Sequence, residues 1–163
     1  MKLQVTTQPT GTDILPLSTA KEFLRVDSSD EDLTITALIN AAVQHCQDYT
    51  NRHFVASDFN LYLDDFYNCS FDIGPVVSIT SVVYKDSANA QQTLAASKYW
   101  ADFKREPARI RFDSPPDTYD DAFNVVTVAG TLGEAPQQPV VHAIKMLVAH
   151  YYENRRAVVA GVK

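Results

Sequence analysis

The sequence predicts an α+β fold, a small helical bundle of a short, a long and a C-terminal helix with an inserted antiparallel β meander. Two observations predict it. Apolar residues recur at helical spacing within residues 18–54 and again within 139–156, whereas apolar and polar residues alternate as in strands within 58–130. A chain of 163 residues is typical of one domain. We therefore expect residues 1–163 to form a single domain.

The long helix, expected between Leu33 and Phe54, organises the rest of the bundle. Its apolar face has the i, i+3, i+4, i+7 spacing of an amphipathic helix and comprises Ile35, Leu38, Ile39, Ala42, Cys46 and Tyr49. The opposite face is small and polar and comprises Ala37, Ala41, Gln44 and Asp48. Ser28 and Glu31 have the spacing of a capping box, which predicts the helix start. The apolar face needs a partner, and the small face would let a second backbone approach closely.

The chain before this helix is expected to be simpler. Residues 1–16 show no periodicity, so we predict an extended arm. A short helix follows, capped by Ser18 or Thr19, with a small apolar face that includes Phe23. It should end near Val26 and lead directly into the long helix.

The middle of the sequence predicts short antiparallel strands joined by turns. Alternation is clearest around Phe59, and β-branched residues dominate 76–85. Further strands are expected near Leu94 and within 99–103, 109–112 and 124–128. In the 109–112 strand the two arginines alternate with Ile110 and Phe112, which predicts one basic and one buried face. The acidic, proline-bearing loop 114–121 should be exposed, and its role is open.

The last helix should begin at Pro139, whose missing N–H has no partner in a first helical turn. Its apolar stripe comprises Val140, Val141, Ile144, Leu147, Val148, Tyr151 and Tyr152. We expect this stripe to pack on the long helix. Residues 157–163 are too few to fold alone and are predicted to form a flexible arm.

Composition narrows the function. The chain carries 14 basic and 20 acidic residues, a net charge of −6, which argues against a protein whose main task is to grip nucleic acid. The basic residues near the C-terminus predict either a tail that docks on an acidic surface or a solvated end. No apolar run is long enough for a membrane span or resembles a signal peptide, so we expect a protein made in a cytoplasm. Cys46 and Cys69 are expected to be reduced and partly buried.

No enzymatic constellation appears in the sequence. His45 and Cys46 are neighbours on a helix and point about 100° apart, so they cannot chelate one ion together. The common metal, nucleophile-elbow and phosphate-loop motifs are absent. We predict no catalytic residue, no cofactor and no metal. Trp100 is expected in the core or in an interface rather than in a base-stacking platform.

Five segments in this order resemble the head–tail connector (adaptor) proteins of long-tailed bacteriophages and prophages. They are LSTAKEFLRVD (17–27), DEDLTITALINAAVQHCQDYTNRHF (30–54), PVVSITSVVYKD (75–86), VTVAGTLG (126–133) and PVVHAIKMLVAHYYENRRAV (139–158). The most distinctive pieces are Tyr-Thr-Asn-Arg at 49–52 and Tyr-Glu-Asn-Arg at 152–155.

The resemblance implies a non-enzymatic virion protein, present in the host cytoplasm before assembly. Such proteins form a ring, usually twelvefold, beneath the portal of the filled head. The ring extends the DNA channel and offers a surface to the next connector, stopper or tail protein. An acidic channel fits this role, because it lets DNA slide without specific binding.

A ring needs two different patches on each subunit. The expected interface residues are Ala37, Ala41, Gln44, His142, Met146 and Ala149, with plain solvent exposure as the alternative. The expected portal-docking residues are Tyr152, Arg155, Arg156, Val158, Val159, Val162 and Lys163. From Arg155 onward they are expected to leave the last helix as an arm that becomes ordered only on the portal.

Two other functions stay open at this point. The first is a DNA-packaging factor that binds duplex DNA directly, for which the surface would be Lys98, Lys104, Arg105, Arg109 and Arg111. The second is a small enzyme whose site the sequence does not reveal.

Overall fold

The computed structural model describes residues 1–7, 9–120 and 122–155, and the chain divides into two compact units. The strand unit comprises residues 1–8 and 51–134, and the helical unit comprises 9–50 and 135–163. The α+β class predicted from the sequence is confirmed. That all 163 residues act as one domain stays a prediction.

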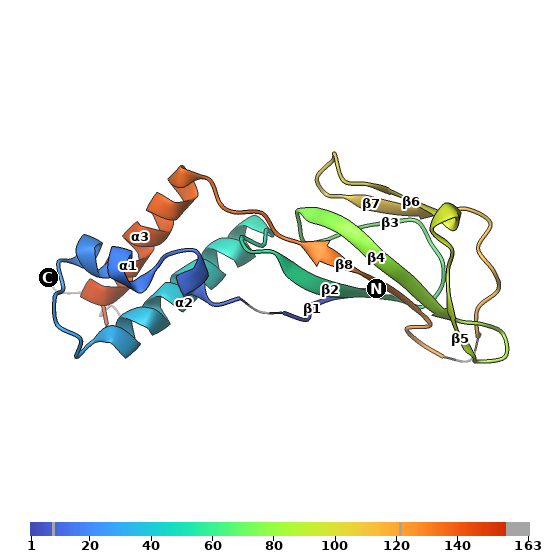
Figure 1. Ribbon diagram of the computed structural model, residues 1–163, viewed down its shortest axis with the longest axis horizontal. Coiled ribbons are helices and arrows are strands. Elements are labelled where there is room, and N and C mark those ends of the chain that lie inside the picture. Colours follow the sequence, from blue (N-terminus) through green and yellow to red (C-terminus); the bar gives the residue numbers. More distant parts are fainter. Residues whose placement is uncertain (8, 121, 156–163) are drawn as a thin grey trace, which may run out of the picture. The chain divides into compact units, whose positions relative to one another are not determined.

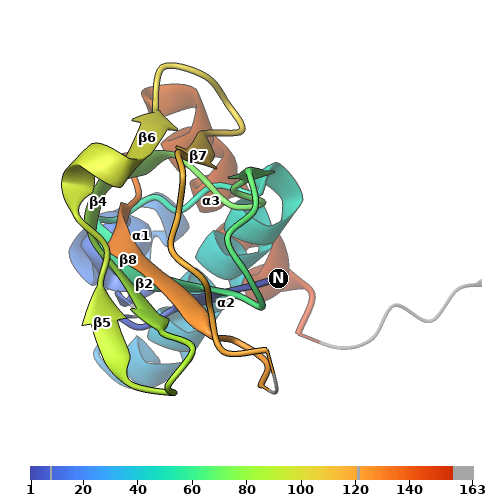
Figure 2. The same cartoon turned by 90° about the vertical axis from the view of Figure 1, so that its right-hand side faces the viewer.

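The strand unit contains two antiparallel sheets. In the first, the strand order is β1–β2–β8–β4–β5, with β1 at Lys2–Val5, β2 at Ser57–Leu63, β4 at Val76–Lys85, β5 at Gln91–Thr93 and β8 at Val126–Leu132. In the second, the order is β3–β7–β6, with β3 at Cys69–Ser70, β6 at Tyr99–Asp102 and β7 at Arg109–Phe112. A 3-10 turn at Ala96–Lys98 precedes β6. Figures 1 and 2 show this arrangement.

The antiparallel pairing is as predicted, but the strand order is not that of a meander. The last strand, β8, lies between β2 and β4 and pairs with both, as in Phe59 with Gly130 and Gly130 with Ile79. Its residues Val126, Val128 and Leu132 are fully or almost fully buried. An apolar strand of this kind is most stable in the middle of a sheet, where both of its backbone edges find partners.

The N-terminal residues form β1 instead of the predicted extended arm. The backbone of β1 pairs with β2 in the register Lys2 with Tyr62 through Val5 with Phe59. Leu3 and Val5 pack against the core of the strand unit while Lys2 and Gln4 face outward. Only two apolar residues mark this strand, so the alternation was too short to detect.

One hydrophobic core joins the two sheets of the strand unit. Each sheet contributes the alternate residues of its inward face, as the pleat requires. The core comprises Phe59, Leu61 and Leu63 of β2, Val76 and Val82 of β4, Ile110 and Phe112 of β7, and Val126, Val128 and Leu132 of β8, with Phe71, Leu94, Ala108 and Val125. As predicted for β7, Arg109 and Arg111 are exposed and Ile110 and Phe112 are buried.

The helical unit consists of a 3-10 turn at Gly11–Asp13, α1 at Leu17–Leu24, α2 at Asp32–Thr50 and α3 at Gln138–Glu153. As predicted, α2 and α3 pack together, with Ile35 and Ile39 of α2 and Ile144 and Val148 of α3 fully or almost fully buried. The Gly11 N–H donates a 2.8 Å hydrogen bond to Asn40 Oδ1. A Cβ at position 11 would lie 2.9 Å from the Asn40 Cα, so only glycine fits against α2 here.

Several helix ends differ from the prediction. α2 ends at Thr50, four residues before Phe54, because Asn51 adopts a left-handed conformation with φ 51°. α1 has Pro16 as its N-cap and no side-chain cap, so neither Ser18 nor Thr19 fills that role. Tyr49, expected on the apolar face of α2, is 85% exposed.

The predicted capping box at the start of α2 does not form. Ser28 accepts a 3.1 Å hydrogen bond from the Asp30 N–H, and Glu31 turns to residues at the end of α3 instead.

Candidate assembly surfaces

The end of α3 is fastened to the start of α2 by a charged cluster around Glu31. The Tyr152 hydroxyl donates a hydrogen bond to Oε2 of Glu31. The Arg155 guanidinium lies 2.6 Å from the other carboxylate oxygen and 4.3 Å from the centre of the Tyr152 ring. The Arg155 Nε also donates to the Tyr152 carbonyl at 3.1 Å. A carboxylate whose two oxygens take different donors, together with an aromatic ring beneath the cation, fixes the directions of all three side chains.

The electrostatics of this cluster favour the ionised carboxylate. The hydrogen bond from Tyr152, and then the one from Arg155, lower the pKa of Glu31 below its ordinary value. The same hydrogen bond raises the pKa of Tyr152, because a phenolate would face a carboxylate. The groups lie at the surface, where water screens charge, so the cluster sets geometry more than it supplies stability.

This cluster corrects one sequence prediction and bears on another. Arg155 was expected to leave the helix as the start of a free arm, but it is tied to Glu31 within the helical unit. Tyr152, the other described member of the portal-docking set, is half-buried in the same cluster. The remaining expected docking residues, Arg156, Val158, Val159, Val162 and Lys163, and the arm at 157–163 lie outside the described residues.

The residues expected at a subunit interface are mostly on the surface of the subunit. Ala37, Ala41 and Gln44 are exposed on one face of α2, as the helical periodicity predicted. On α3, His142 and Met146 are exposed and Ala149 is half-buried. The His142 ring meets the edge of Phe23 with ring centres 6.4 Å apart. That these two faces meet neighbouring subunits stays a prediction.

An apolar groove, which the sequence did not indicate, lies between the end of α2 and the start of α3. It has a volume of about 380 Å³ and is lined by residues that include Cys46, Tyr49, Pro139 and Leu147. Burial raises the pKa of the Cys46 thiol, which is therefore a poor nucleophile. The periodicity of the sequence placed Tyr49 on the apolar face of the long helix. This apolar position near the helix end was the one feature of the sequence that could have indicated the groove.

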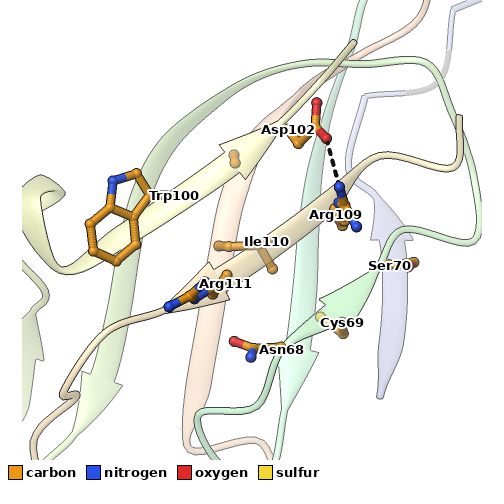
Figure 3. A pocket seen from close by; sticks show the side chains of 9 residues that line it. Asn68, Cys69, Ser70, Trp100, Asp102, Arg109, Ile110 and Arg111 are labelled. Carbon is orange, nitrogen blue, oxygen red and sulfur yellow. Dashed lines mark hydrogen bonds and ion pairs between the residues drawn. The ribbon is translucent and has the colours of Figure 1, made fainter. Parts of the chain in front are cut away.

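A second concave surface, the hairpin groove, lies on the outer face of the β3–β7–β6 sheet and has a volume of about 560 Å³. Figure 3 shows the side chains that line it, and those that matter here are Asn68, Cys69, Trp100, Asp102, Arg109 and Arg111. The Asn68 side chain is held by β7, because its Oδ1 accepts a 3.0 Å hydrogen bond from the Phe112 N–H.

The charges in the hairpin groove are unequal. Arg109 is paired with Asp102 at 3.2 Å. Arg111 lies 5.9 Å from the centre of the Trp100 ring, and among the described residues no carboxylate pairs with it. Trp100 was predicted to lie in the core or in an interface. Because its side chain is 54% exposed, it is not a core residue, and its place in an interface stays a prediction. The groove therefore offers an aromatic face beside an unneutralised cation.

The basic residues that would serve a DNA-binding protein are Lys98, Lys104, Arg105, Arg109 and Arg111, and all five are exposed. Lys98 contacts the Ser114 carbonyl at 3.4 Å, and Arg109 is neutralised by Asp102. The hairpin between β6 and β7 is thus a local basic surface on an acidic chain, although part of its charge is already compensated.

The described residues were also compared with the requirements of metal sites and reactive thiols. Within residues 1–7, 9–120 and 122–155, no three His, Cys, Asp or Glu side chains are grouped so that they could hold a metal ion. Cys46 and Cys69 are free thiols, and each is partly buried, as predicted. None of the helices in the described part of the chain has the length and hydropathy of a membrane crossing.

Comparison with protein families decides the class of protein. The model of a family described as "Phage gp6-like head-tail connector protein" matches residues 15–103, more than half of the chain. The chain belongs to this family of phage head–tail connectors. The resemblance seen in the sequence is thereby confirmed. No curated protein matches this connector.

The fold of the connector also occurs in solved structures of gene transfer agents (GTA), which are phage-like particles. One is titled "Virion of native gene transfer agent (GTA) particle" (TM-score 0.77, 21% identity, 99% of this chain and 89% of that chain). Another is "Neck of empty GTA particle computed with C6 symmetry" (0.75, 22%, 100% and 89%). A third is "Neck of native GTA particle computed with C12 symmetry" (0.73, 22%, 99% and 88%). The likeness spans both units of this connector.

Proposed function

We propose that this connector assembles as a twelvefold ring beneath the portal of the filled phage head. The ring extends the DNA channel and presents its far side to the next connector, stopper or tail protein. It is a structural virion component without catalytic activity, which waits in the host cytoplasm before assembly. The observation that carries this proposal is the family match over residues 15–103. The similarity to chains from GTA necks with C6 and C12 symmetry supports the ring.

The charge of the chain fits passage of DNA without specific binding. A net charge of −6 disfavours the counterion release that drives proteins onto phosphate backbones. A channel lined by such subunits would repel the duplex weakly and let it slide.

The C-terminal end of α3 is the proposed contact with the portal. Tyr152 and Arg155 are held by Glu31, so the last described residue of the chain, Arg155, is fixed to the helical unit. The residues that follow include Arg156 and Lys163 and the apolar Val158, Val159 and Val162. Valines buried in a portal groove, with the basic groups on portal carboxylates, would be coupled folding and binding.

Imaging tests the ring, and truncation tests the docking arm. Negative-stain images of the purified connector, alone and mixed with its own portal protein, should show rings on the portal. Deletion of residues 157–163 should leave the melting temperature of the connector nearly unchanged and weaken portal attachment. A truncated connector that binds portals with full affinity would show that the arm is not the docking element. Absence of any connector density on portals would remove the proposed function altogether.

The exposed basic hairpin favours one second candidate, a packaging factor that binds duplex DNA. Lys104, Arg105 and Arg111 have no carboxylate partner among the described residues. Electrophoretic shift of duplex DNA at low and physiological salt separates the two functions. A connector should give a shift only at low salt, whereas a packaging factor should retain binding at physiological salt.

A further inference from the structure

The hairpin groove is equipped to bind an apolar side chain next to a carboxylate. Trp100 is half exposed on β6, and Arg111 of β7 lies over its ring without a carboxylate partner in the described part of the chain. Tryptophan and arginine are the residues that most often dominate binding at protein interfaces. Because Asp102 already neutralises Arg109, the groove has room for about one further negative group beside Arg111.

A complementary feature lies on the loop between β7 and β8 of the same unit. Phe123 is 86% exposed, although a phenylalanine ring is normally buried. The carboxylates of Asp117 and Asp120 lie within six residues of it, and among the described residues no cation pairs with either. The loop therefore presents an apolar ring in an acidic setting.

Three described residues of this loop are anchored by hydrogen bonds to the strand unit. The Asn124 N–H donates to Asp64 Oδ1 at 2.9 Å, the Thr118 hydroxyl to Asp65 Oδ1 at 3.0 Å, and the Tyr119 N–H to the Lys85 carbonyl at 3.1 Å. These anchors belong to the ends of β2 and β4, whereas the hairpin groove belongs to β3, β6 and β7. The loop and the groove are thus two different patches of one unit.

We propose that Phe123 of one subunit enters the hairpin groove of its neighbour in the ring, where Asp120 and Asp117 face Arg111. This inference rests on the proposed ring, which requires a head-to-tail contact between two unlike patches. Charge complementarity selects a second copy as the occupant, since among the described residues neither Arg111 nor the two loop carboxylates have a partner of opposite charge. The exposed Phe123 and the half-exposed Trp100 would be buried together, with offset or edge-on ring packing.

Duplex DNA fits the same groove less well. DNA binding requires several free cations aligned along the phosphates, and one of the two arginines in the groove is paired with Asp102. DNA binding in this groove would also leave the Phe123 ring exposed to water. DNA binding is therefore an outcome that the experiment must detect, not the proposal.

The first test is a charge exchange, read as ring assembly on the cognate portal protein by mass photometry and negative stain. Arg111→Glu should raise the connector concentration needed for rings about tenfold, because it places like charges across the contact. Arg111→Glu combined with Asp120→Arg should restore assembly, since the attraction is re-formed with exchanged signs. Lys2→Glu, an exposed lysine on β1, is the matched control and should assemble as the wild type does. Unchanged assembly of Arg111→Glu, or failure of the double variant to recover, would overturn the proposal.

The second test places a thiol on the outer face of the β3–β7–β6 sheet, at Ser70, which is exposed and lines the groove. In the variant with Ser70→Cys and Asp120→Cys, a short bismaleimide should join position 70 of one subunit to position 120 of its neighbour. Denaturing gels should then show a ladder of dimers, trimers and larger species from portal-bound rings. Asp120→Cys alone should give no ladder, because Cys69 packs against the core and burial raises the pKa of its thiol. A ladder from this single variant would contradict the proposed contact.

These outcomes are separable from the fate of the proposed function. If the wild type and the cross-linking variant both form rings on portals but the variant gives no ladder, this contact is refuted and the connector function stands. Wild-type protein that forms no ring on portals would refute the function itself. Loss of duplex DNA shift in Arg111→Glu, with normal ring assembly, would assign the groove to DNA and also overturn the contact.

Discussion

Gly130 is the position in the strand unit where a single added methyl group should do most harm. It lies in the middle of β8, between Phe59 of β2 and Ile79 of β4. A Cβ at position 130 would lie 2.2 Å from the Ser78 carbonyl oxygen and 2.9 Å from a Phe59 ring carbon. The first of these neighbours is backbone in a paired strand, so it cannot rotate away as a flexible side chain would.

The expected loss of stability follows from this geometry. An ordinary contact requires the Ser78 carbonyl to retreat by roughly 1 Å, which disturbs the β4–β8 pairing around it. Overpacking of a closed core costs about 1–3 kcal/mol, and a backbone clash places Gly130→Ala toward the upper end, about 2–3 kcal/mol. For a chain of this size, that is a fall in melting temperature of roughly 4–12 °C.

Tryptophan fluorescence is the assay suited to Gly130→Ala, because the only tryptophan of the chain, Trp100, lies in the strand unit. Thermal and urea unfolding of the variant should be compared with Gly74→Ala. At position 74 a Cβ would have its nearest neighbour 3.9 Å away, so this control should change the free energy of unfolding by less than about 1 kcal/mol. A melting temperature of Gly130→Ala within about 1 °C of the wild type would refute the steric reasoning.

Three further predictions concern the helical unit and the chemistry of the chain. Ile144→Ala on α3 removes a fully buried side chain between packed helices and should lower the free energy of unfolding in urea by about 2–5 kcal/mol; a loss under about 0.5 kcal/mol would show that this face is not core. The pKa of Glu31 is lowered by Tyr152 and Arg155, so its contribution is present above the ordinary carboxyl pKa and disappears as the pH falls through the depressed value. The difference in melting temperature between wild type and Glu31→Gln should therefore shrink on acidification, and a difference independent of pH would exclude an ionic origin. Elemental analysis should find no stoichiometric, tightly held metal, because no ligand set was found in the sequence or among the described residues.

Elements whose signal is local could be predicted from the sequence. The spacing of Ile35, Ile39 and Ala42 fixed the buried face of α2, and the alternation of Arg109 with Ile110 fixed the faces of β7. Such patterns are reliable because a helix or a strand repeats its own geometry, so each residue's face depends on its near neighbours alone. The head–tail connector class was also readable, since five segments in a fixed order specify more than any one amphipathic pattern.

How distant segments of the chain meet could not be predicted from local patterns and is seen in the structure alone. β1 became a strand through pairing with β2, and β8 entered between β2 and β4, which no local propensity encodes. Glu31 does not cap α2 as expected but contacts Tyr152 and Arg155, more than a hundred residues away. A surface carboxylate is stabilised more by a cation and a phenol than by one backbone N–H. The exposure of Trp100 was likewise set by which face of the β3–β7–β6 sheet packs on the core. These features depend on long-range contacts. The energies of such contacts are as large as local preferences, so the contacts can reverse what a local pattern predicts.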